Sequence, residues 1–362
     1  MRIAQVAPLA EAVPPKLYGG TERVVSWLTE ELVRRGHDVT LFASGDSQTS
    51  AKLLPLCPQA LRLSNINDHI PMHLVALKHV RRLAHQFDVI HFHLDLLQYP
   101  LFEEMGNKTV TTLHGRLDIS DYHPVYSAFP NMPLVSISLQ QRGPMPETVN
   151  WLANIPHGMP MHNITFSKGP GEYLAFVGRI SPEKRPDRAI QIATQAGVPI
   201  KLAAKIDHVD RAYYESCIAP LLEHPLVDFV GEISEAQKSA FYGGARALLF
   251  PIDWPEPFGL VMIEAMAAGT PIVAWNNGSV PEVIRHGRSG LIVDNIDDAV
   301  AAVNAIDKLD RKIVRAEFER RYTVSSMAQC YERAYEKLLG RPAYPSNAEG
   351  RREDGAAAAL AV

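Results

Sequence analysis

Short apolar runs alternate with amphipathic segments from the start of the chain to about residue 340. Runs of this length, rich in branched side chains and bounded by turn residues, are typical of buried strands. In the first half of the chain we expect strands over Ile3–Ala7, Val39–Ala43, Val89–Phe92, Thr109–Leu113, Leu134–Ile137 and Asn150–Ile155. In the second half we expect them over Tyr173–Val177, Ile200–Ala204, Val227–Val230, Ala247–Phe250, Ile272–Ala274 and Leu291–Val293.

Helical spacing of apolar residues separates these strands. Within 21–35, the residues Val24, Leu28 and Leu32 repeat at the period of a helix, and Thr21 stands where an N-cap is expected. Two further helices are predicted near the end, over Asp310–Arg321 and Val324–Leu339. Strands that alternate with helices predict an α/β fold in which parallel sheets are covered by helices on both faces.

The alternation breaks at 157–171, where Gly and Pro cluster and no periodicity remains. We therefore predict two doubly wound, Rossmann-like domains facing each other across a cleft. Ligands of open α/β sheets bind at the carboxyl ends of the strands, so this cleft is the expected site. The predicted boundaries are 1–157 for the first domain, 158–171 for the linker, 172–322 for the second domain, 323–340 for a helix that packs back toward the first, and 341–362 for a disordered tail.

Composition and charge exclude several classes of protein. The 362 residues are 46% hydrophobic, and 36 Lys plus Arg stand against 40 Asp plus Glu, for a net charge of −4. This balance does not provide the overall basic field of a nucleic-acid-binding protein. No apolar run reaches the roughly 18–20 residues of a membrane span, and Met1–Val6 lacks the layout of a signal peptide. The three cysteines stand in no paired array, which suits a reducing cytoplasm.

The strongest motif follows the predicted strand 247–250 and reads WPEPFGLVMIEAMAAGTP. It places Glu256 in a Pro-rich loop, Gly259 in the first turn of a helix, and Glu264 eight positions after Glu256. Free N–H groups at such a helix start can bind an anion, and the two carboxylates can accept hydroxyl protons from a sugar. Glu264 could instead be a solvated helix residue, but its apolar neighbours favour a carboxylate that faces a cleft.

A second motif, FVGRISPEKRP, follows the predicted strand 173–177. Arg179 and Lys184 leave this strand end through Gly178 and could together bind a diphosphate. They could also be surface cations beside Glu183.

Two weaker motifs lie in the first half. Gly19 and Gly20 follow the first strand within YGGTE, without the spacing of a dinucleotide fold or a P-loop. His114 ends a strand and can point into the cleft, although a lone histidine is more often structural.

A metal site is also conceivable, because His91 and His93 lie on one strand face with Asp95 nearby. The sequence offers no further ligands at a suitable spacing.

The segment 74–87 has an apolar stripe and a cationic face formed by Lys78, Arg81 and Arg82. Such a helix can lie on an anionic membrane. A packing helix with a solvated outer face is the more common outcome.

Together these motifs resemble the retaining family-4 glycosyltransferases (glycosyl transferases group 1), which have the two-domain GT-B fold. Glu256 to Glu264 resembles the E-x7-E motif of that family, FVGRISPEK its phosphate-binding loop, and YGGTERVV its N-terminal glycine loop. The resemblance covers residues 1 to about 340. HGMP at 157–160 departs from the Asn-Gly-acidic pattern common in the family, which puts the interdomain contact there in doubt.

The resemblance implies a nucleotide-sugar donor, a UDP-sugar before a GDP- or ADP-sugar, bound mainly by the second domain, and a hydroxyl acceptor on the side of the first. The acceptor could be a saccharide, a lipid-linked molecule or a small molecule. The implied catalytic residues are His114, Glu256, Arg179 and Lys184. The implied donor-binding residues are Gly19, Gly20, Gly178, Phe258, Gly259, Leu260, Val261 and Glu264.

In these implied roles, Arg179 and Lys184 neutralise the diphosphate, Glu264 holds the ribose, and Glu256 and His114 contact the transferred sugar. Transfer in the family retains the anomeric configuration and usually proceeds without a metal ion, so we expect neither a metal nor a cofactor here. We expect a cytoplasmic enzyme with no nucleic-acid partner, able to contact the inner membrane face through 74–87.

Two alternatives remain open at this point. Sugar-nucleotide 2-epimerases share the architecture, but the acid and base groups that they need are not evident beside the E-x7-E loop. A catalytically silent nucleotide-sugar-binding protein would retain the same binding residues.

Overall fold

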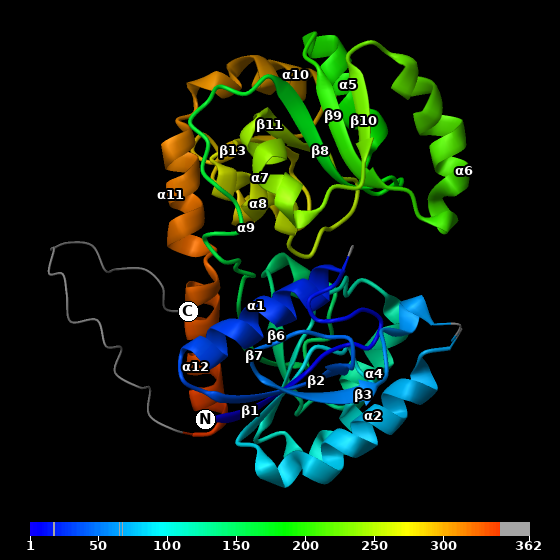
Figure 1. The fold of residues 1–362 in the computed structure, drawn as a ribbon, viewed down its shortest axis with the longest axis vertical. Helices are drawn as coiled ribbons and strands as arrows, with labels where there is room; N and C mark the ends of the chain where they lie inside the picture. Colours follow the sequence, from blue (N-terminus) through cyan, green and yellow to red (C-terminus); the bar gives the residue numbers. More distant parts are fainter. Residues whose placement is uncertain (17–18, 65, 67, 341–362) are drawn as a thin grey trace, which may run out of the picture.

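The computed structural model describes residues 1–16, 19–64, 66 and 68–340 and shows two halves, each built on one sheet (Figure 1). The chain completes the first half, crosses to the second, and returns to the first with its last helix. The predicted α/β class with two doubly wound sheets is confirmed. The predicted tail, 341–362, lies outside the described residues.

The first sheet has seven parallel strands in the order β3-β2-β1-β4-β5-β6-β7. The order reverses between β1 and β4, and a crevice for ligands opens at such a point. The strands are β1 (Arg2–Val6), β2 (Asp38–Ser44), β3 (Lys52–Cys57), β4 (Val89–Phe92), β5 (Thr109–Thr112), β6 (Pro133–Ser136) and β7 (Asn150–Asn154).

The second sheet has six parallel strands in the order β10-β9-β8-β11-β12-β13 and reverses between β8 and β11. Alternate residues of β8 enter opposite cores, Tyr173 and Ala175 on one face and Leu174 and Phe176 on the other. The sheet is therefore buried on both sides. Its strands are β8 (Tyr173–Arg179), β9 (Ile200–Lys205), β10 (Val227–Gly231), β11 (Ala245–Phe250), β12 (Ile272–Trp275) and β13 (Gly290–Val293).

Helices connect the strands and cover the sheets (Figure 1). Their bounds in the first half are α1 (Gly20–Arg34), α2 (Ile70–Leu83), α3 (Tyr99–Phe102) and α4 (His123–Ala128). In the second half they are α5 (Pro186–Ala196), α6 (Arg211–Tyr213), α7 (Glu235–Gly243), α8 (Leu260–Ala268), α9 (Val280–Val283), α10 (Ile296–Ala305) and α11 (Arg311–Arg321). The last helix is α12 (Val324–Leu338).

Three local features differ from the sequence-based expectations. Strand β3 was not predicted, because Pro55 interrupts its pattern; at the edge of the sheet the missing N–H is tolerated. Thr21 does not cap α1, since the cap position is Gly19 and no side chain bonds there. The helix expected over 74–87 starts earlier, at Ile70, and ends in a 3₁₀ turn at Ala84–Gln86.

The two crossings between the halves run side by side. The Met159 N–H donates to the Tyr322 carbonyl at 2.9 Å, and the Val324 N–H donates to the Met159 carbonyl at 2.9 Å. Gly158 packs so closely that a Cβ there would lie 2.3 Å from the Thr323 carbonyl oxygen. The segment that leaves the first half at Met159 and the segment that returns at Val324 therefore form one paired connection. A side chain at position 158 would separate the two segments.

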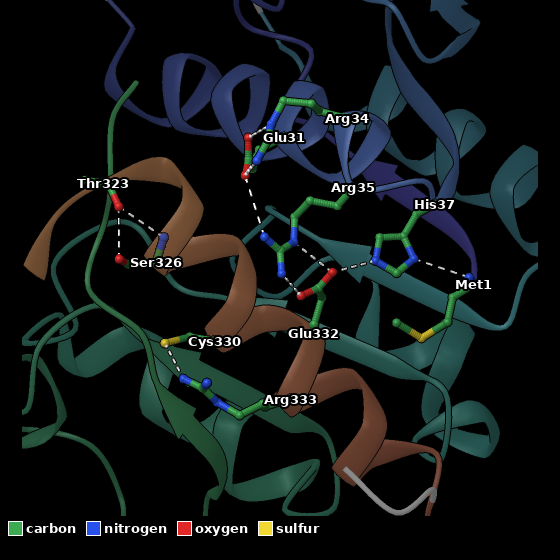
Figure 2. Close-up of polar contacts among 10 residues, drawn as sticks. All are labelled: Met1, Glu31, Arg34, Arg35, His37, Thr323, Ser326, Cys330, Glu332 and Arg333. Atoms are coloured by element: carbon green, nitrogen blue, oxygen red, sulfur yellow. Dashed lines mark hydrogen bonds and ion pairs between the residues drawn. The ribbon is translucent and has the colours of Figure 1, made fainter. Parts of the chain in front are cut away.

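Helix α12 packs against α1 and β7 in the first half. Figure 2 shows Glu332 between Arg35 and His37, with hydrogen bonds of 2.6 and 2.9 Å from the Arg35 guanidinium and 2.8 Å to His37 Nε2. Burial alone would raise the pKa of the Glu332 carboxyl, but the bonds from His37 and Arg35 lower that pKa to about 2. The charged side chain thus fixes a helix that is remote in sequence.

We expect Glu332→Gln to lower the free energy of unfolding by about 1–2 kcal/mol at pH 7, because Arg35 and His37 lose a charged partner. The carboxylate stabilises the fold above its unfolded-state pKa, and this contribution declines as the pH falls from about 4.5 toward 2. Urea unfolding at several pH values measures the difference from the wild type. Glu336→Gln, one turn further along α12, is the matched control; equal losses in both variants would contradict the assignment.

Candidate functional site

A cleft of about 870 Å³ lies between the two halves. Its lining comes from the carboxyl-terminal ends of strands or from the segments after them, at β1, β5, β6 and β7 in the first sheet and at β8, β9, β10 and β11 in the second. The carboxyl ends of both sheets therefore face the same space, where the fold class places ligands.

Two helices begin at this cleft. A Cβ built on Gly20, the first residue of α1, would lie 3.7 Å from Leu260 Cδ1, at the first residue of α8, so the two N-termini nearly touch. Gly259 precedes α8 with φ +80°, and a Cβ there would come within 2.8 Å of Met262 and 3.1 Å of the Phe250 ring. Only glycine fits at position 259, and the first residues of both helices line the cleft, where N–H groups at a helix start can bind an anion.

Lys184 and Glu256 form an ion pair in the cleft. Trp254 supports it, since its Nε1–H donates to Glu256 at 3.1 Å and its ring lies 4.7 Å from the Lys184 ammonium. A cation and a carboxylate, both largely shielded from solvent, are thus available side by side to a ligand.

Glu264 is buried on α8 and paired from helix α7. Lys238 Nζ donates to it at 2.6 Å and the Tyr242 hydroxyl at 2.8 Å. Burial alone would raise the pKa of the Glu264 carboxyl, but Lys238 and Tyr242 hold that pKa below its usual value. Glu264 therefore remains an ionised acceptor at neutral pH.

An ion pair between Arg23 of α1 and Glu235 of α7 joins the two halves across the cleft. Lys238 contacts the same Glu235 at 2.8 Å and so links this pair to Glu264. The four side chains form one alternating series of charges along the cleft wall.

His114 lines the cleft from the end of β5. Its Nε2 lies 2.9 Å from His93 Nδ1, and its ring stacks on His157 at 5.1 Å. His157 in turn meets the Phe258 ring of the second half at 5.0 Å, so HGMP does make a contact between the halves. Burial lowers the pKa of His114 to about 3 and that of His157 well below the usual value, and both rings are neutral.

Eleven of the twelve site residues expected from the sequence line the cleft: Gly19, Gly20, His114, Gly178, Lys184, Glu256, Phe258, Gly259, Leu260, Val261 and Glu264. Arg179 does not line it. The Arg179 guanidinium lies 2.5 Å from Glu183, 3.8 Å from Asp207 and 3.7 Å from Asp210. Its predicted contact with a diphosphate stays a prediction, which requires the side chain to leave these carboxylates.

Sequence reasoning missed Arg23, Lys238 and Tyr242, and it named His157 only within HGMP, where it put an interdomain contact in doubt. Glu235, Lys238 and Tyr242 stand at i, i+3 and i+7, so a polar stripe on one helical face was the available signal for two of them. The ring contacts of His157 could not be predicted, because His114 and Phe258 are distant from it in the sequence.

The metal site considered for His91 and His93 does not form. His91 contacts Tyr335 and Thr112, and His93 contacts Gln5 and His114, so both nitrogens of each ring already have protein partners. Within the described ranges, no group of three or more His, Cys, Asp or Glu side chains could hold a metal ion.

Comparison with known proteins identifies the family. The family model for "Glycosyl transferases group 1" matches residues 161–321, and that for "Glycosyltransferase Family 4" matches residues 18–143. The chain belongs to the family-4 glycosyltransferases with the GT-B fold. This glycosyltransferase is 26% identical to a phosphatidyl-myo-inositol mannosyltransferase of Mycobacterium leprae, over 93% of this chain and 97% of the relative. It is 25% identical to a D-inositol 3-phosphate glycosyltransferase of Mycolicibacterium smegmatis, over 92% of this chain and 91% of the relative.

Solved structures share the fold of this glycosyltransferase. AviGT4, a glycosyltransferase involved in avilamycin A biosynthesis, has a TM-score of 0.70 at 20% identity and covers 93% of this chain and 98% of its own. Anabaena HepE in complex with UDP and glucose has a TM-score of 0.71 at 16% identity, and the match covers 93% of this chain and 100% of HepE.

No helix in the described part of the chain combines the length and the apolar character that a membrane span requires.

We expect Lys238→Met to lower the free energy of unfolding of this glycosyltransferase by about 2–3 kcal/mol at pH 7, because it leaves the buried Glu264 carboxylate without its cation. The difference from the wild type should grow as the pH rises above about 4.5, where the unfolded-state carboxyl ionises.

The control is the double variant Lys238→Met/Glu264→Gln, in which no unpaired charge remains. It should recover part of the loss, as measured by urea unfolding. Strictly additive losses from the two substitutions would show that the pair is not coupled.

Proposed function

We propose that this enzyme transfers a sugar from a nucleotide-sugar donor to a hydroxyl acceptor with retention of configuration and without a metal ion. The observation that carries the proposal is the cleft itself, which is lined by the paired Lys184 and Glu256, by the N-termini of two helices and by the buried, ionised Glu264. Cations and N–H groups suit a diphosphate, while carboxylates suit sugar and ribose hydroxyls.

Each part of the donor has a complementary group. The diphosphate lies at the start of α8, near Gly259, with Lys184 as its cation and Arg179 as a second one once it leaves Glu183. Glu264 accepts the ribose hydroxyl protons. Glu256 and His114 contact the transferred sugar from opposite halves of the molecule.

The main catalytic help is electrostatic. Negative charge builds on the nucleotide diphosphate as the glycosidic bond breaks, and preorganised cations and N–H groups stabilise that charge. The acceptor hydroxyl attacks from the face that the diphosphate leaves, and a donor phosphate oxygen takes its proton. Glu256 orients the sugar and forms no covalent bond; a glycosyl adduct trapped on Glu256 would contradict this mechanism.

We propose a UDP-sugar as donor. Ala204, Lys205 and Ile233 line the cleft at the ends of β9 and β10, where a base can meet backbone groups. A protein of the same fold, Anabaena HepE, was solved in complex with UDP-glucose. The acceptor is a saccharide, a lipid-linked molecule or a small molecule that enters from the first half.

Transfer and 2-epimerisation separate in one assay. A nucleotide sugar incubated without acceptor releases nucleotide slowly in a transferase and yields epimerised sugar in an isomerase. Release that is unchanged by a metal chelator supports the metal-independent reaction. A catalytically silent binding protein would bind the donor but would transfer its sugar to none of the acceptors tested.

We expect Lys184→Ala to weaken UDP-sugar binding by about tenfold or more, because a buried charge-assisted contact to the diphosphate is lost. Calorimetric titration measures the affinity, and circular dichroism checks that the fold persists. Lys201→Ala is the control, since Lys201 pairs with Asp228 at the surface of the same half. Unchanged affinity in Lys184→Ala would remove Lys184 from the donor site.

We also propose that the enzyme contacts the inner membrane face through the segment 74–87. Leu77 and Val80 of α2 are buried in the core, while Ile70, Leu74 and Val75 are 52%, 47% and 66% exposed. The exposed cations Lys78 and Arg82 follow on the same helix. Apolar side chains beside cations fit an anionic bilayer surface.

We expect Val75→Asp to reduce sedimentation with phosphatidylglycerol vesicles several-fold, because it places a charge in the contact surface. Val209→Asp is the control, as Val209 is exposed on the other half. Equal binding to phosphatidylcholine vesicles, or no effect of Val75→Asp, would count against the membrane contact.

A further inference from the structure

A carboxylate of the second half binds the backbone of the first. Glu282 lies on α9, and its two oxygens accept hydrogen bonds from the Leu139 N–H at 2.8 Å and the Gln140 N–H at 2.7 Å. These N–H groups lie where the chain leaves β6 and enters a 3₁₀ turn, Gln140–Arg142. The first N–H groups of such a turn have no partner within it, so a carboxylate is a suitable acceptor for both. One side chain thus joins the two halves.

Within the second half, α9 is fixed to the loop that carries Glu256. The Ser279 N–H, just before α9, donates to the Glu256 carbonyl at 2.9 Å, and the Ser279 hydroxyl donates to the Phe258 carbonyl at 2.9 Å. Gly278 packs so closely that a Cβ there would lie 2.3 Å from the Glu256 backbone nitrogen. Because Glu282 follows Ser279 on the same short helix, its carboxylate and the Glu256 loop form one unit.

Within the first half, the turn that α9 binds is fixed to the loop that carries His114. The Gln141 amide nitrogen donates to the carbonyls of Leu113 and Gly115 at 2.9 and 2.8 Å. These two residues flank His114 in the sequence. The Gln141 side-chain oxygen accepts from the Ile137 N–H at 2.9 Å, so the side chain is committed on both sides. The turn and the His114 loop therefore form a second unit.

Helix α9 also lies beside the crossing between the halves. Arg321 Nη1 and the Tyr322 hydroxyl both donate to the Val283 carbonyl, each at 3.2 Å. The Tyr322 carbonyl in turn accepts from the Met159 N–H of the outgoing segment. A rotation of the second half about this crossing would carry α9 with it and would separate Glu282 from the turn after β6. The two bonds of Glu282 are therefore made when the cleft is closed.

We propose that Glu282 is a positioning residue that couples closure of the cleft to assembly of the site, because it holds the Glu256 loop of one half against the His114 loop of the other. This rests on the proposed function, in which Glu256 and His114 contact the transferred sugar from opposite halves. Glu282 itself does not line the cleft, so it acts on the reaction through the two loops. Its effect falls on the placing of sugar and acceptor rather than on the nucleotide, whose contacts lie mainly in the second half.

The first test needs no ligand. Hydrogen–deuterium exchange read by mass spectrometry should show segment 137–142 exchanging about tenfold faster in Glu282→Ala than in the wild type, because the Leu139 and Gln140 N–H groups lose their acceptor. Glu319→Gln is the control, since Glu319 pairs with Arg315 inside the second half. Equal exchange of this segment in Glu282→Ala and the wild type would overturn the proposal.

The second test separates positioning from binding. With a UDP-sugar that the wild type transfers, Glu282→Ala should lower kcat by about tenfold or more, because the groups that hold the sugar are displaced. Calorimetric titration with UDP should give a Kd within about twofold of the wild type. Glu282→Gln keeps one acceptor oxygen, so its kcat should fall between the two, and it carries the test if Glu282→Ala fails to fold. A kcat equal to that of the wild type, or a loss confined to UDP affinity, would overturn the positioning role.

The outcomes separate the two proposals. Faster exchange in Glu282→Ala, with a wild type that transfers sugar from no nucleotide donor, would support the coupling of the two loops and overturn the proposed function. Sugar transfer by the wild type with an unchanged kcat in Glu282→Ala and Glu282→Gln would support the function and overturn the positioning role.

Discussion

Charges buried in a cleft must be paired, and this requirement organises the site. Removing a carboxylate from water is costly unless a cation or several hydrogen bonds replace the solvent. The Glu264 carboxylate is paired with Lys238 and Tyr242. The Glu256 carboxylate is paired with Lys184 and Trp254. Each carboxylate of the cleft therefore has a cation and a further hydrogen-bond donor in place of solvent.

Charged, apolar and backbone contacts connect the two halves. The pair of Arg23 and Glu235 crosses the cleft, and the apolar side chains of Trp27 and Leu260 pack against the cores of both halves. The adjacent crossings at Met159 and Val324 form a second connection behind the site. The two halves are thus connected both by a charged contact across the cleft and by the paired backbone of the crossings.

Neutral histidines give the other wall of the cleft a different character. His114 and His157 stack against each other, and burial keeps both uncharged. The neutral rings therefore add no charge to this wall of the cleft.

Much of this could be predicted from the sequence, because local patterns determine it. Apolar periodicity identified every strand except β3, and the motif around Glu256, Gly259 and Glu264 indicated residues that line the cleft. What the sequence did not show are contacts between residues distant along the chain: Arg179 held by Asp207 and Asp210, Lys238 on Glu264, and Gln5 bonded to Tyr335, 330 positions away. Backbone preference and burial act over a few neighbouring residues, whereas the partner of a polar side chain depends on which elements pack together, and only the tertiary structure decides that.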